Sequence, residues 1–412
     1  METRKDLHTV TLDADKCKGC INCIKRCPTE AIRVRDGKAK VMYEKCIGCG
    51  ECIRICTNRA KRAVYDNFDI INDFKYKIVL PAPSLYGQFN NLSDINFVLQ
   101  GLLSLGFDKV FEVSRGAEIV SEITRRYLDD GLIKKPVISS ACPAVVELIL
   151  LRFHELKQNL LPILAPVDIA AKLARKEAEE QTGFKGDDIG VFFISPCPAK
   201  VFAIKGSLGT KRPYIDGVLA QSDIYFRLIP EMKKIKKPDN LAKSGIIGIG
   251  WASSGGEAAG MLKEKYLAAD GVENCISILK ELEDGKLRDL DFIELNACPG
   301  GCVGGVLNIE NPFIARAKIM ALRKYLPVAK NRTNDFSLSD DFYMWERAPE
   351  TISALKIDED RGVALRKMQQ VEEILATLPM LDCGVCGAPS CRAFAEDVVN
   401  GVVTVDKCIR KT

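Results

Sequence analysis

The spacing of the cysteines is the feature of this sequence that points most directly to chemistry. All but Cys275 of the 17 cysteines fall into groups, and the chain has only two histidines, His8 and His154. Sites of mixed Cys/His type, such as many zinc sites, are therefore poorly supplied. Groups made of thiolates alone are typical of iron–sulfur clusters or zinc. We interpret Cys275, which stands alone on a predicted helix, as a core thiol.

Two cysteine runs near the N-terminus share one spacing. The first has the pattern C-x2-C-x2-C-x3-C-P and comprises Cys17, Cys20, Cys23 and Cys27. The second has Thr57 in place of the proline and comprises Cys46, Cys49, Cys52 and Cys56. In bacterial two-cluster ferredoxins, the fourth cysteine of each run ligates the other cluster. The pattern therefore predicts one 4Fe-4S cluster on Cys17, Cys20, Cys23 and Cys56, and another on Cys46, Cys49, Cys52 and Cys27. Two zinc sites are the alternative.

Each run is followed by a short stretch that we predict to be helical, "TEAIRV" at 29–34 and "NRAKRAV" at 58–64. Two similar halves of this kind are typical of a ferredoxin, and we assign residues 1–75 to an α+β ferredoxin-like domain. Such a domain carries single electrons and does no bond-making chemistry. Another part of the chain is therefore expected to use the electrons.

The elements that follow must position a second set of cysteines. Between residues 76 and 330, six stretches run apolar and then stop at small residues, which predicts strands at "YKIVLPAPS", "KVFEVS", "PVISSACP", "IGVFFISPCP", "SGIIGIGWASSGG" and "DFIELNACPGGC". Amphipathic helices separate them. Near-continuous apolar strands favour parallel sheets covered by helices on both faces, so we predict an α/β domain over 76–330.

Three of these strands end in a Cys-Pro pair. The pairs begin at Cys142, Cys197 and Cys298, and the last loop adds Cys302. In open α/β sheets, ligands bind beyond the carboxyl ends of the strands, so these four thiols are expected to converge on one site. The glycines of "CPGGCVGG" allow the backbone to approach a bulky inorganic group closely. A set of inert core cysteines is the alternative.

These loops resemble the signature motifs of a known family. The stretches "SSACP", "SPCPAK" and "ELNACPGGCVGG" are similar to the three motifs of the iron-only, or FeFe, hydrogenases, and "APS" at 82–84 and "WASSGGEA" at 251–258 agree with them. The resemblance covers roughly residues 1–330. It implies a 4Fe-4S cubane that Cys302 bridges to a two-iron subcluster with CO, CN and azadithiolate ligands. The implied ligands of the cubane are Cys142, Cys197, Cys298 and Cys302.

The resemblance also implies which residues contact the two-iron subcluster. Lys200 matches the lysine that contacts one cyanide, and the loop of Ala82, Pro83 and Ser84 matches the loop that contacts the other. A buried ammonium is costly unless it is paired, and a metal-bound cyanide is an anionic acceptor that would pair it. An ordinary surface position is the alternative for Lys200.

Departures from the family pattern concern the route of protons. Ala141 stands where strongly catalytic members have a cysteine that exchanges protons, and an alanine cannot bind or release one. Leu161 replaces a hydroxyl-bearing position further along the route. Ser121 and Thr124 match the positions of glutamates. Glu122 is displaced from them by one residue, which on a helix turns its side chain away.

The methionines that flank the metal centre in the family are also replaced, by Ser195 and Asn296. General acid–base help is typically worth about 10²–10⁴ in rate, so a route with most of its groups changed predicts slow conversion of hydrogen. A slow and reversible hydrogen-binding centre linked to electron-transfer clusters is better suited to sensing than to bulk catalysis.

The C-terminal region contains the last group of cysteines. After residue 330, a polar stretch over 331–350 is predicted to be a linker. The remaining residues, 351–412, have the spacing C-x2-C-x4-C-x16-C at Cys383, Cys386, Cys391 and Cys408. This resembles the small four-cysteine iron–sulfur domain of redox-complex subunits and some hydrogenase-like proteins. It implies a mostly helical domain with a fourth 4Fe-4S cluster, and zinc is the alternative.

Composition and charge narrow the expected partners and location. The net charge is +4, and the one basic run, at 233–237, is short, so no nucleic-acid partner is expected. The N-terminal residues lack the apolar segment of a secretory signal. No stretch nears the roughly 18 apolar residues that would span a bilayer, so we expect no membrane association and a cytoplasmic location.

Three functions are compatible with these patterns. We favour a low-activity FeFe hydrogenase that reversibly converts H2 to protons and electrons and acts as an H2 or redox sensor. Its expected partners are a ferredoxin or another redox protein, a separate kinase or phosphatase, the H-cluster maturation proteins and a second copy of the chain. The alternatives are a catalytic ferredoxin-linked hydrogenase with a modified proton path and a non-catalytic iron–sulfur assembly or scaffold protein of hydrogenase ancestry.

Overall fold

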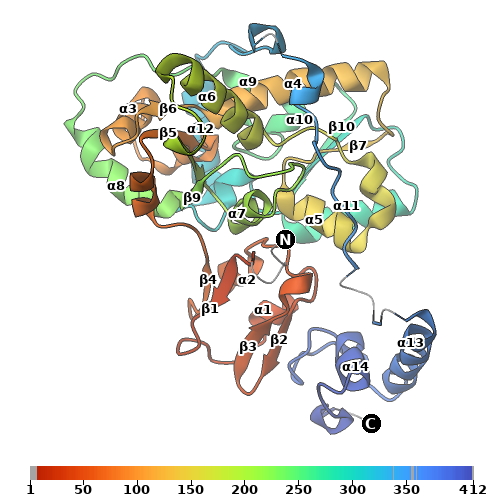
Figure 1. Ribbon diagram of the computed structural model, residues 1–412. Helices are drawn as coiled ribbons and strands as arrows, with labels where there is room; N and C mark the ends of the chain where they lie inside the picture. The colour runs from red at the N-terminus through yellow and green to blue at the C-terminus, as the bar shows by residue number, and fades with distance from the viewer. Residues whose placement is uncertain (1–6, 337, 354–356, 359, 411–412) are drawn as a thin grey trace.

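The computed structural model describes residues 7–336, 338–353, 357–358 and 360–410, which form three parts (Figure 1). An N-terminal domain with two small sheets lies against one end of a large α/β domain. A small helical C-terminal module lies beside the N-terminal domain. This arrangement confirms the fold class predicted from the sequence.

The N-terminal domain is built from two similar halves. Strand β1 (Val10–Leu12) pairs antiparallel with β4 (Lys61–Ala63). Strand β2 (Ile32–Arg35) pairs antiparallel with β3 (Lys38–Val41). The two pairs flank the two cysteine runs in the chain and give the runs equivalent surroundings.

The stretches that follow the cysteine runs are strands rather than the predicted helices. Residues 29–34 lead into β2, and residues 58–64 contain β4. The short helices lie inside the cysteine runs instead, as α1 (Asn22–Lys25) and α2 (Glu51–Arg54). Each stretch is too short to make two full turns of helix, whereas pairing with a neighbouring strand satisfies its backbone groups.

The first sheet of the large domain has four parallel strands in the order β6-β5-β8-β9. They are β5 (Tyr76–Pro81), β6 (Lys109–Val110), β8 (Ile189–Ser195) and β9 (Gly217–Ala220). All seven residues of β8 are buried, as expected for a strand covered by helices on both faces. The strand predicted at "KVFEVS" is limited to its first two residues, because a long helix begins at Val113.

The second sheet has three parallel strands in the order β10-β11-β7. They are β7 (Val137–Ile138), β10 (Tyr266–Asp270) and β11 (Phe292–Asn296). Strands β9 and β10 are not among the strands predicted from the sequence. The stretch of β10 is half-exposed and lacks the continuous apolar run that marks the inner strands.

The stretch "SGIIGIGWASSGG" at 244–256 is not the strand that we predicted. It forms α9 (Ile246–Gly250), and α10 (Gly256–Gly260) follows. A short apolar run fits a buried helix as well as a strand, and here packing decides between them. Gly248 lets α9 lie directly on the helix that begins at Val113, because a Cβ there would be 2.3 Å from the carbonyl oxygen of Ser114.

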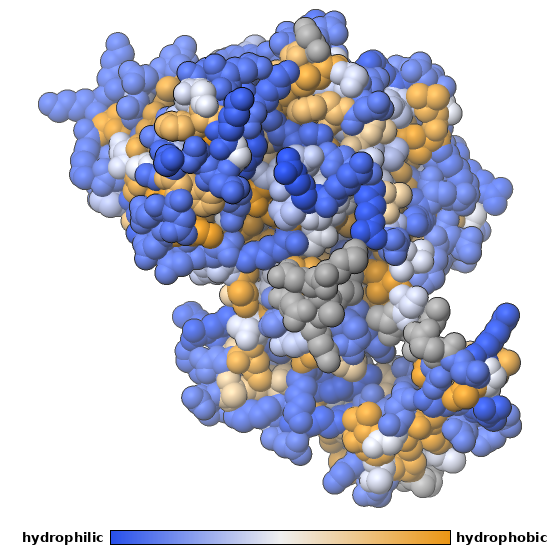
Figure 2. Space-filling model, in the orientation of Figure 1, coloured by the Kyte–Doolittle hydropathy of each residue, from blue (hydrophilic) through white to orange (hydrophobic). Residues whose placement is uncertain are grey.

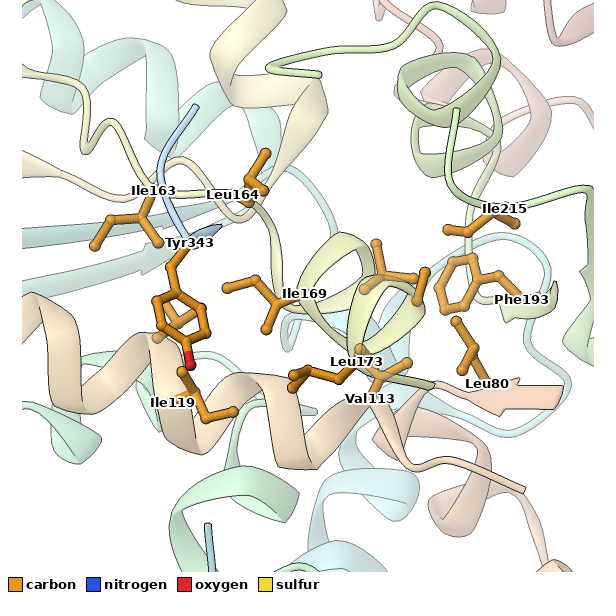
Figure 3. Packing of buried hydrophobic residues seen from close by; sticks show 14 of the residues in the cluster. Leu80, Val113, Ile119, Ile163, Leu164, Ile169, Leu173, Phe193, Ile215 and Tyr343 are labelled. Carbon is orange, nitrogen blue, oxygen red and sulfur yellow. The ribbon is translucent and has the colours of Figure 1, made fainter. Parts of the chain in front are cut away.

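Helices cover both sheets and enclose the cores. One core lies between the first sheet, α4 and α6, and contains Leu80 and Phe193 of the sheet together with Ile119, Ile169 and Leu173 of the helices (Figure 3). A second core lies between the second sheet, α5 and α11, and a third lies under α3, α8 and α12. The bounds of the helices are α3 (Asn96–Ser104), α4 (Val113–Asp130), α5 (Pro143–Arg152), α6 (Pro166–Thr182), α7 (Pro198–Lys205), α8 (Gln221–Lys234), α11 (Val272–Glu283) and α12 (Pro312–Arg323).

Part of the stretch predicted as a linker packs on the large domain. Thr333 donates hydrogen bonds to the carboxylate of Glu122 through its backbone N–H at 2.9 Å and its hydroxyl at 3.0 Å. Tyr343 is fully buried in the core of α4 and α6. The backbone N–H of Trp345 bonds to the carbonyl of Pro162. The described residues of 331–345 therefore form a strap across the large domain.

The C-terminal module consists of α13 (Arg361–Leu375), α14 (Cys391–Val399) and the loop between them. It docks on β2 of the N-terminal domain, where the backbone N–H of Val34 bonds to the carbonyl of Gly387 at 2.8 Å. Arg33 and Arg35 both donate to the carboxylate of Asp397 on α14. In the described part of the chain, no helix is both long and apolar enough to cross a membrane.

Candidate functional site

Four thiols from three loops converge beyond the strand ends of the large domain. Cys142 and Cys197 are the residues immediately before α5 and α7, and Cys298 and Cys302 follow β11. Burial, together with the nearby thiols of Cys197 and Cys142, raises the pKa of Cys302 to about 12. Burial likewise raises the pKa of Cys298, which the other three thiols also surround. The structure thus brings together the four cysteines that the sequence singled out.

Glycines make this convergence possible. A Cβ at Gly304 would be 1.8 Å from the carbonyl oxygen of Pro299, and one at Gly305 would be 2.2 Å from that of Pro196. Gly301 has φ of 88°, and a Cβ there would be 2.4 Å from the backbone nitrogen of Ser254. The "CPGGCVGG" loop can therefore fold tightly on itself and lie in contact with the neighbouring loops only because these positions lack side chains.

The four thiols fit a polynuclear metal group. Thiols held together in the interior with raised pKa values are poorly stable as anions on their own, whereas bound metal supplies the positive charge that ionises them. Cys142 and Cys197 are the N-cap residues of α5 and α7, each of which begins with proline, so the free N–H groups of those first turns lie close to them in the chain. Across the described residues, no three Cys, His, Asp or Glu side chains are close enough to chelate one ion. A cubane places its thiolate ligands on separate irons.

A cavity adjoins Cys302. It is lined by Ala82, Pro83, Ala141 and Lys200, all four of which the sequence analysis placed near the metal centre. Ser84 lies next to this cavity in the chain, but its hydroxyl accepts a hydrogen bond from the Nε2 of Gln221 at 2.8 Å. Trp251 and Asn296 complete one side of the cavity.

Lys200 belongs to this cavity rather than to the surface. Its ammonium donates to the carbonyl of Ala141 at 3.2 Å. Burial alone would lower its pKa, but the thiols of Cys302, Cys197 and Cys142 raise it above its ordinary value. Burial raises the pKa of the nearby Asp168 to about 7, with Lys200 acting in the opposite direction. Lys200 is thus the cation that faces the thiols from within the cavity.

Two buried carboxylates of the cavity were missed by the sequence analysis. Glu257 accepts a hydrogen bond from the hydroxyl of Ser139 at 2.7 Å through Oε2, and its Oε1 has no partner among the described residues. Glu294 accepts from the backbone N–H groups of Gly255 at 2.9 Å and Ala258 at 2.8 Å, and from Asn296 at 2.7 Å.

Burial raises the pKa of both carboxyls, and the charge of Glu294 raises that of Glu257 further. Three donors stabilise the anion of Glu294, so Glu257 is the member that holds a proton. The sequence offered one signal for each buried carboxylate. Glu294 is an acidic residue inside the apolar strand "FIELN", and Glu257 is the acidic residue of "GGEA".

The residues that replace the family's proton-route positions make local contacts instead. Ser121 donates to the carbonyl of Ala117 at 3.0 Å, and Thr124 donates to that of Val120 at 2.7 Å. Leu161 is buried in the apolar core. Glu122 binds Thr333 of the strap, as its displaced helical position predicts. Ser195 donates to the carbonyl of Cys197 at 2.9 Å. These side chains serve the local structure.

In the N-terminal domain, the fourth cysteine of each run lies near thiols of the other run. Burial raises the pKa of Cys23, and the thiols of Cys20, Cys17 and Cys56 add to that rise. Burial also raises the pKa of Cys49 and Cys52, and the thiols of Cys27 and Cys46 raise both pKa values further. We name these groups the outer set, Cys17, Cys20, Cys23 and Cys56, and the inner set, Cys46, Cys49, Cys52 and Cys27.

The inner set is the one next to the large domain. Cys49 packs in the same apolar cluster as Cys197. Arg54 of α2 donates to the carbonyl of Gly304 at 2.8 Å, and the hydroxyl of Thr9 donates to that of Pro198 at 3.0 Å. The inner set therefore adjoins the loops that carry the four thiols of the large domain. We name these the strand-end thiols, Cys142, Cys197, Cys298 and Cys302.

The C-terminal thiols lie on the other side of the N-terminal domain. One small cavity is lined by all four of them, Cys383, Cys386, Cys391 and Cys408. Lys25 of α1, two residues after Cys23 of the outer set, donates to the carbonyl of Pro389 at 3.2 Å. A Cβ at Gly384 would be 3.4 Å from Ile24. The loop of the C-terminal thiols thus touches the helix that carries Cys23.

Cys275 has no part in any of these groups. It is fully buried on α11, and its thiol donates to the carbonyl of Asn296 at 3.4 Å. The interpretation as a core thiol is confirmed.

Comparison with known families identifies the large domain. The family model described as iron only hydrogenase large subunit, C-terminal domain, matches residues 75–256 and 225–306, which is more than half of the chain. The chain belongs to the iron-only hydrogenase family. A 4Fe-4S dicluster domain matches residues 9–57 of this hydrogenase-family chain, and a domain described as a putative Fe-S cluster matches residues 378–410.

Individual relatives are distant. The chain is 25% identical over 364 residues to the periplasmic Fe hydrogenase large subunit of Nitratidesulfovibrio vulgaris, covering 73% of this chain and 86% of that protein. It is 26% identical over 140 residues to iron hydrogenase 1 of Clostridium pasteurianum, covering 31% of this chain and 24% of that protein. Because one relative is named as periplasmic, the cytoplasmic location stays a prediction.

One further relative matches a short part of the chain, and a solved structure matches a larger part of it. Over 52 residues, 11% of this chain and 28% of that protein, the chain is 42% identical to one subunit of the ion-translocating oxidoreductase complex of Yersinia pestis. Among solved structures, an FeFe-hydrogenase from Chlamydomonas reinhardtii is similar with a TM-score of 0.47 and 17% identity, over 62% of this chain and 86% of that one.

Proposed function

We propose that this hydrogenase-family chain binds and converts H2 slowly and reversibly, and that it reports H2 or redox state to a separate protein. One observation carries the proposal. The cavity at Cys302 retains Lys200, Ala82 and Pro83, which the family resemblance assigns to the metal centre, but has Ala141 where the resemblance predicts a proton-exchanging thiol. The binding groups are kept while the fast proton donor is missing.

The residues have distinct tasks in this proposal. Cys142, Cys197, Cys298 and Cys302 would hold a cubane, and Cys302 would also hold a two-iron subcluster in the adjoining cavity. When bound, this group supplies the splitting or formation of H2 and the transfer of single electrons. Lys200 presents an ammonium for anionic ligands of the irons.

Protons need another carrier because Ala141 cannot supply one. Glu257 lines the same cavity, holds a proton on a buried carboxyl, and has Oε1 free to donate or accept it. Ser139 and Glu294 fix its orientation and charge. A carboxyl elsewhere in the cavity exchanges protons less directly than a thiol at the position of Ala141 would, so turnover is slow.

The positions of the thiol sets support the reporting role. The strand-end thiols, the inner set, the outer set and the C-terminal thiols follow one another through the three parts of the molecule. Clusters on these thiols would place an electron from the cavity within reach of the C-terminal module. The module is therefore suited to report the redox state of the cavity.

The C-terminal module offers a surface for the partner. Apolar side chains gather on it (Figure 2), and Met380, Leu381, Val385 and Ile409 are exposed close to its thiols. An apolar surface next to a cluster suits transient docking of a redox or signalling protein. We propose a ferredoxin-like redox protein or a separate kinase or phosphatase as that partner, with maturation proteins supplying the two-iron subcluster and the chain acting as a dimer.

Infrared spectroscopy of the matured protein tests the metal centre. Bands of CO and cyanide are expected, and a protein with its full iron content but no such bands would instead be an iron–sulfur scaffold. Measured H2 turnover then separates a sensor from a catalyst. Turnover far below that of fast hydrogenases agrees with the proposal. Fast turnover would favour the catalytic alternative, in which Glu257 is an efficient replacement for the missing thiol.

A further inference from the structure

One lysine of the N-terminal domain is buried without a partner. Lys61 opens β4, where it lies opposite Leu12 of β1, and only 3% of its surface is exposed. Its Nζ makes no hydrogen bond to any residue that the structure describes. By contrast, Lys38 in the same domain donates to the carbonyls of Ala14 at 2.6 Å and Cys17 at 3.0 Å. A buried ammonium with no acceptor needs another source of negative charge.

Lys61 lies beside the thiols of the outer set. It follows Ala60, which packs in one buried cluster with Cys17 and Cys23. The backbone N–H of Ala60 bonds to the sulfur of Cys56, another member of that set. The buried ammonium is therefore close to thiols that become anionic when they bind metal.

The other half of the domain has an apolar residue at the equivalent place. Lys61 is the fifth residue after Cys56, and Ile32 is the fifth residue after Cys27. Each opens a strand and each is buried, with 3% and 2% of its surface exposed.

The residues before them are equivalent too. The backbone N–H of Ala60 bonds to the sulfur of Cys56 at 3.2 Å, and that of Ala31 bonds to the sulfur of Cys27 at 3.2 Å. The apolar side chain of Ile32 is therefore enough for packing at this place. The ammonium of Lys61, at the equivalent place in the second half, must have another role.

We propose that Lys61 is a fixed buried cation that raises the reduction potential of the cluster on the outer set above that of the cluster on the inner set. The proposal rests on the proposed function only in requiring clusters on these thiols. Reduction adds one negative charge to a cluster that four thiolates already make anionic, and a nearby ammonium stabilises that charge in a medium of low dielectric constant. Ile32 gives the inner set no such stabilisation.

The consequence is a direction for electrons. The inner set adjoins the loops of Cys197 and Gly304, whereas the outer set adjoins the C-terminal module through Ile24 and Lys25. A higher potential at the outer set holds an electron beside the C-terminal module rather than beside the cavity. Lys61 thereby makes the step that leads away from the hydrogen site the favourable one.

The test compares Lys61→Ile, which copies the residue of the other half, with Lys61→Met, which keeps most of the side-chain length, and with the control Arg62→Met. Arg62 is the next residue of β4, is exposed, and pairs with Asp13 at 3.0 Å. Each full-length protein would be reconstituted with iron and sulfide, its iron content measured, and its clusters titrated by electron paramagnetic resonance at set potentials.

We expect both Lys61 variants to keep their clusters and to lower the reduction equilibrium constant of the outer-set cluster about tenfold, which is about 59 mV for one electron. The inner-set cluster should move less, and the Arg62 variant should match the wild type. Potentials equal to those of the control in either Lys61 variant would overturn the proposal. A wild-type protein that takes up no clusters at all would contradict the proposed function instead, so the two failures are distinguishable.

Discussion

Ala141 and Lys61 stand beside two different sets of thiols, and each differs from the residue that its surroundings lead one to expect. At the strand-end site, Ala141 stands next to Cys142, where the family resemblance predicts a residue able to exchange protons. In the N-terminal domain, the apolar residue seen in one half is replaced by an ammonium in the other, next to Cys23. In both regions the thiols and the turns that carry them are kept. The comparison leads us to propose that the thiols hold the metal group in each region while one neighbouring side chain decides what that group does.

The largest expected effect comes from removing a ligand rather than a neighbour. Cys302→Ser should abolish the CO and cyanide bands and all H2 turnover, because this thiol adjoins both the other thiols and the cavity. The control is Cys275→Ser, which changes a fully buried thiol outside every set and should retain the bands. Infrared spectra of both variants decide the matter, and persistence of the bands in Cys302→Ser would refute the assigned site.

The next largest effect is expected from restoring the missing proton carrier. Ala141→Cys should raise H2 turnover about 100-fold, since positioned acid–base groups typically contribute about 10²–10⁴. Ser140→Cys is the matched control, because the side chain of Ser140 is directed to the carbonyl of Ile163 at 3.2 Å. Turnover assays on matured proteins with equal CO band intensity make the comparison. An equal rise in both variants would show that the position of Ala141 is not special.

A smaller effect is expected at the contact between the N-terminal domain and the C-terminal module. Asp397→Asn should weaken docking by about 2 kcal/mol, because Arg33 and Arg35 lose their shared anion and Arg33 is only 5% exposed. Hydrogen exchange at α14 would become faster, as would proteolysis between the strap and α13. Glu373→Gln, at a position on the exposed side of α13, should change neither rate.

The smallest expected effect concerns stability and pH. Burial raises the pKa of Glu257 well above its ordinary value of 4.5, so the folded protein holds this proton more tightly than the unfolded chain does. The stability associated with that proton is complete at low pH and is lost as pH rises towards the folded-state pKa. Its size is about 1.4 kcal/mol for each tenfold difference in proton affinity between the folded and unfolded states.

Glu257→Gln should therefore show a flatter dependence of melting temperature on pH than the wild type as the pH rises above 4.5, the ordinary pKa of a glutamate. The exposed Glu264→Gln serves as the control. A wild-type melting temperature that rises over this range in step with that of Glu257→Gln would contradict the assignment of the proton to Glu257.

Much of the molecule could be predicted from the sequence because cysteine spacing and apolar strands are local signals. The runs at Cys17 and Cys46 and the loops at Cys142, Cys197 and Cys298 lie where their spacing placed them. Helices α9 and α10 could not be predicted in this way, because a run such as "GIIGIG" fits a strand until the contact of Gly248 with Ser114 is known. Pattern alone does not include such tertiary contacts.

The buried charges were missed for a related reason. Glu257, Glu294 and Lys61 occur in sequence as single charged residues within short apolar stretches, and a charge is normally assigned to the surface. Only the packing of strands and loops shows that all three face thiols or the cavity beside them. Comparing the two halves of the N-terminal domain residue by residue would have revealed Lys61, since Ile32 occupies its equivalent place.

The strap and the docked module together close the polypeptide into a ring. The chain leaves the N-terminal domain, passes through the large domain, crosses it as the strap as far as Trp345, and returns to β2 through α14. Separation of Arg33 from Asp397 would then be an intramolecular opening, because the released module stays tethered at a high effective concentration. A partner that competes for either face has to act against that tether, so its occupancy will follow small changes in the strength of one contact.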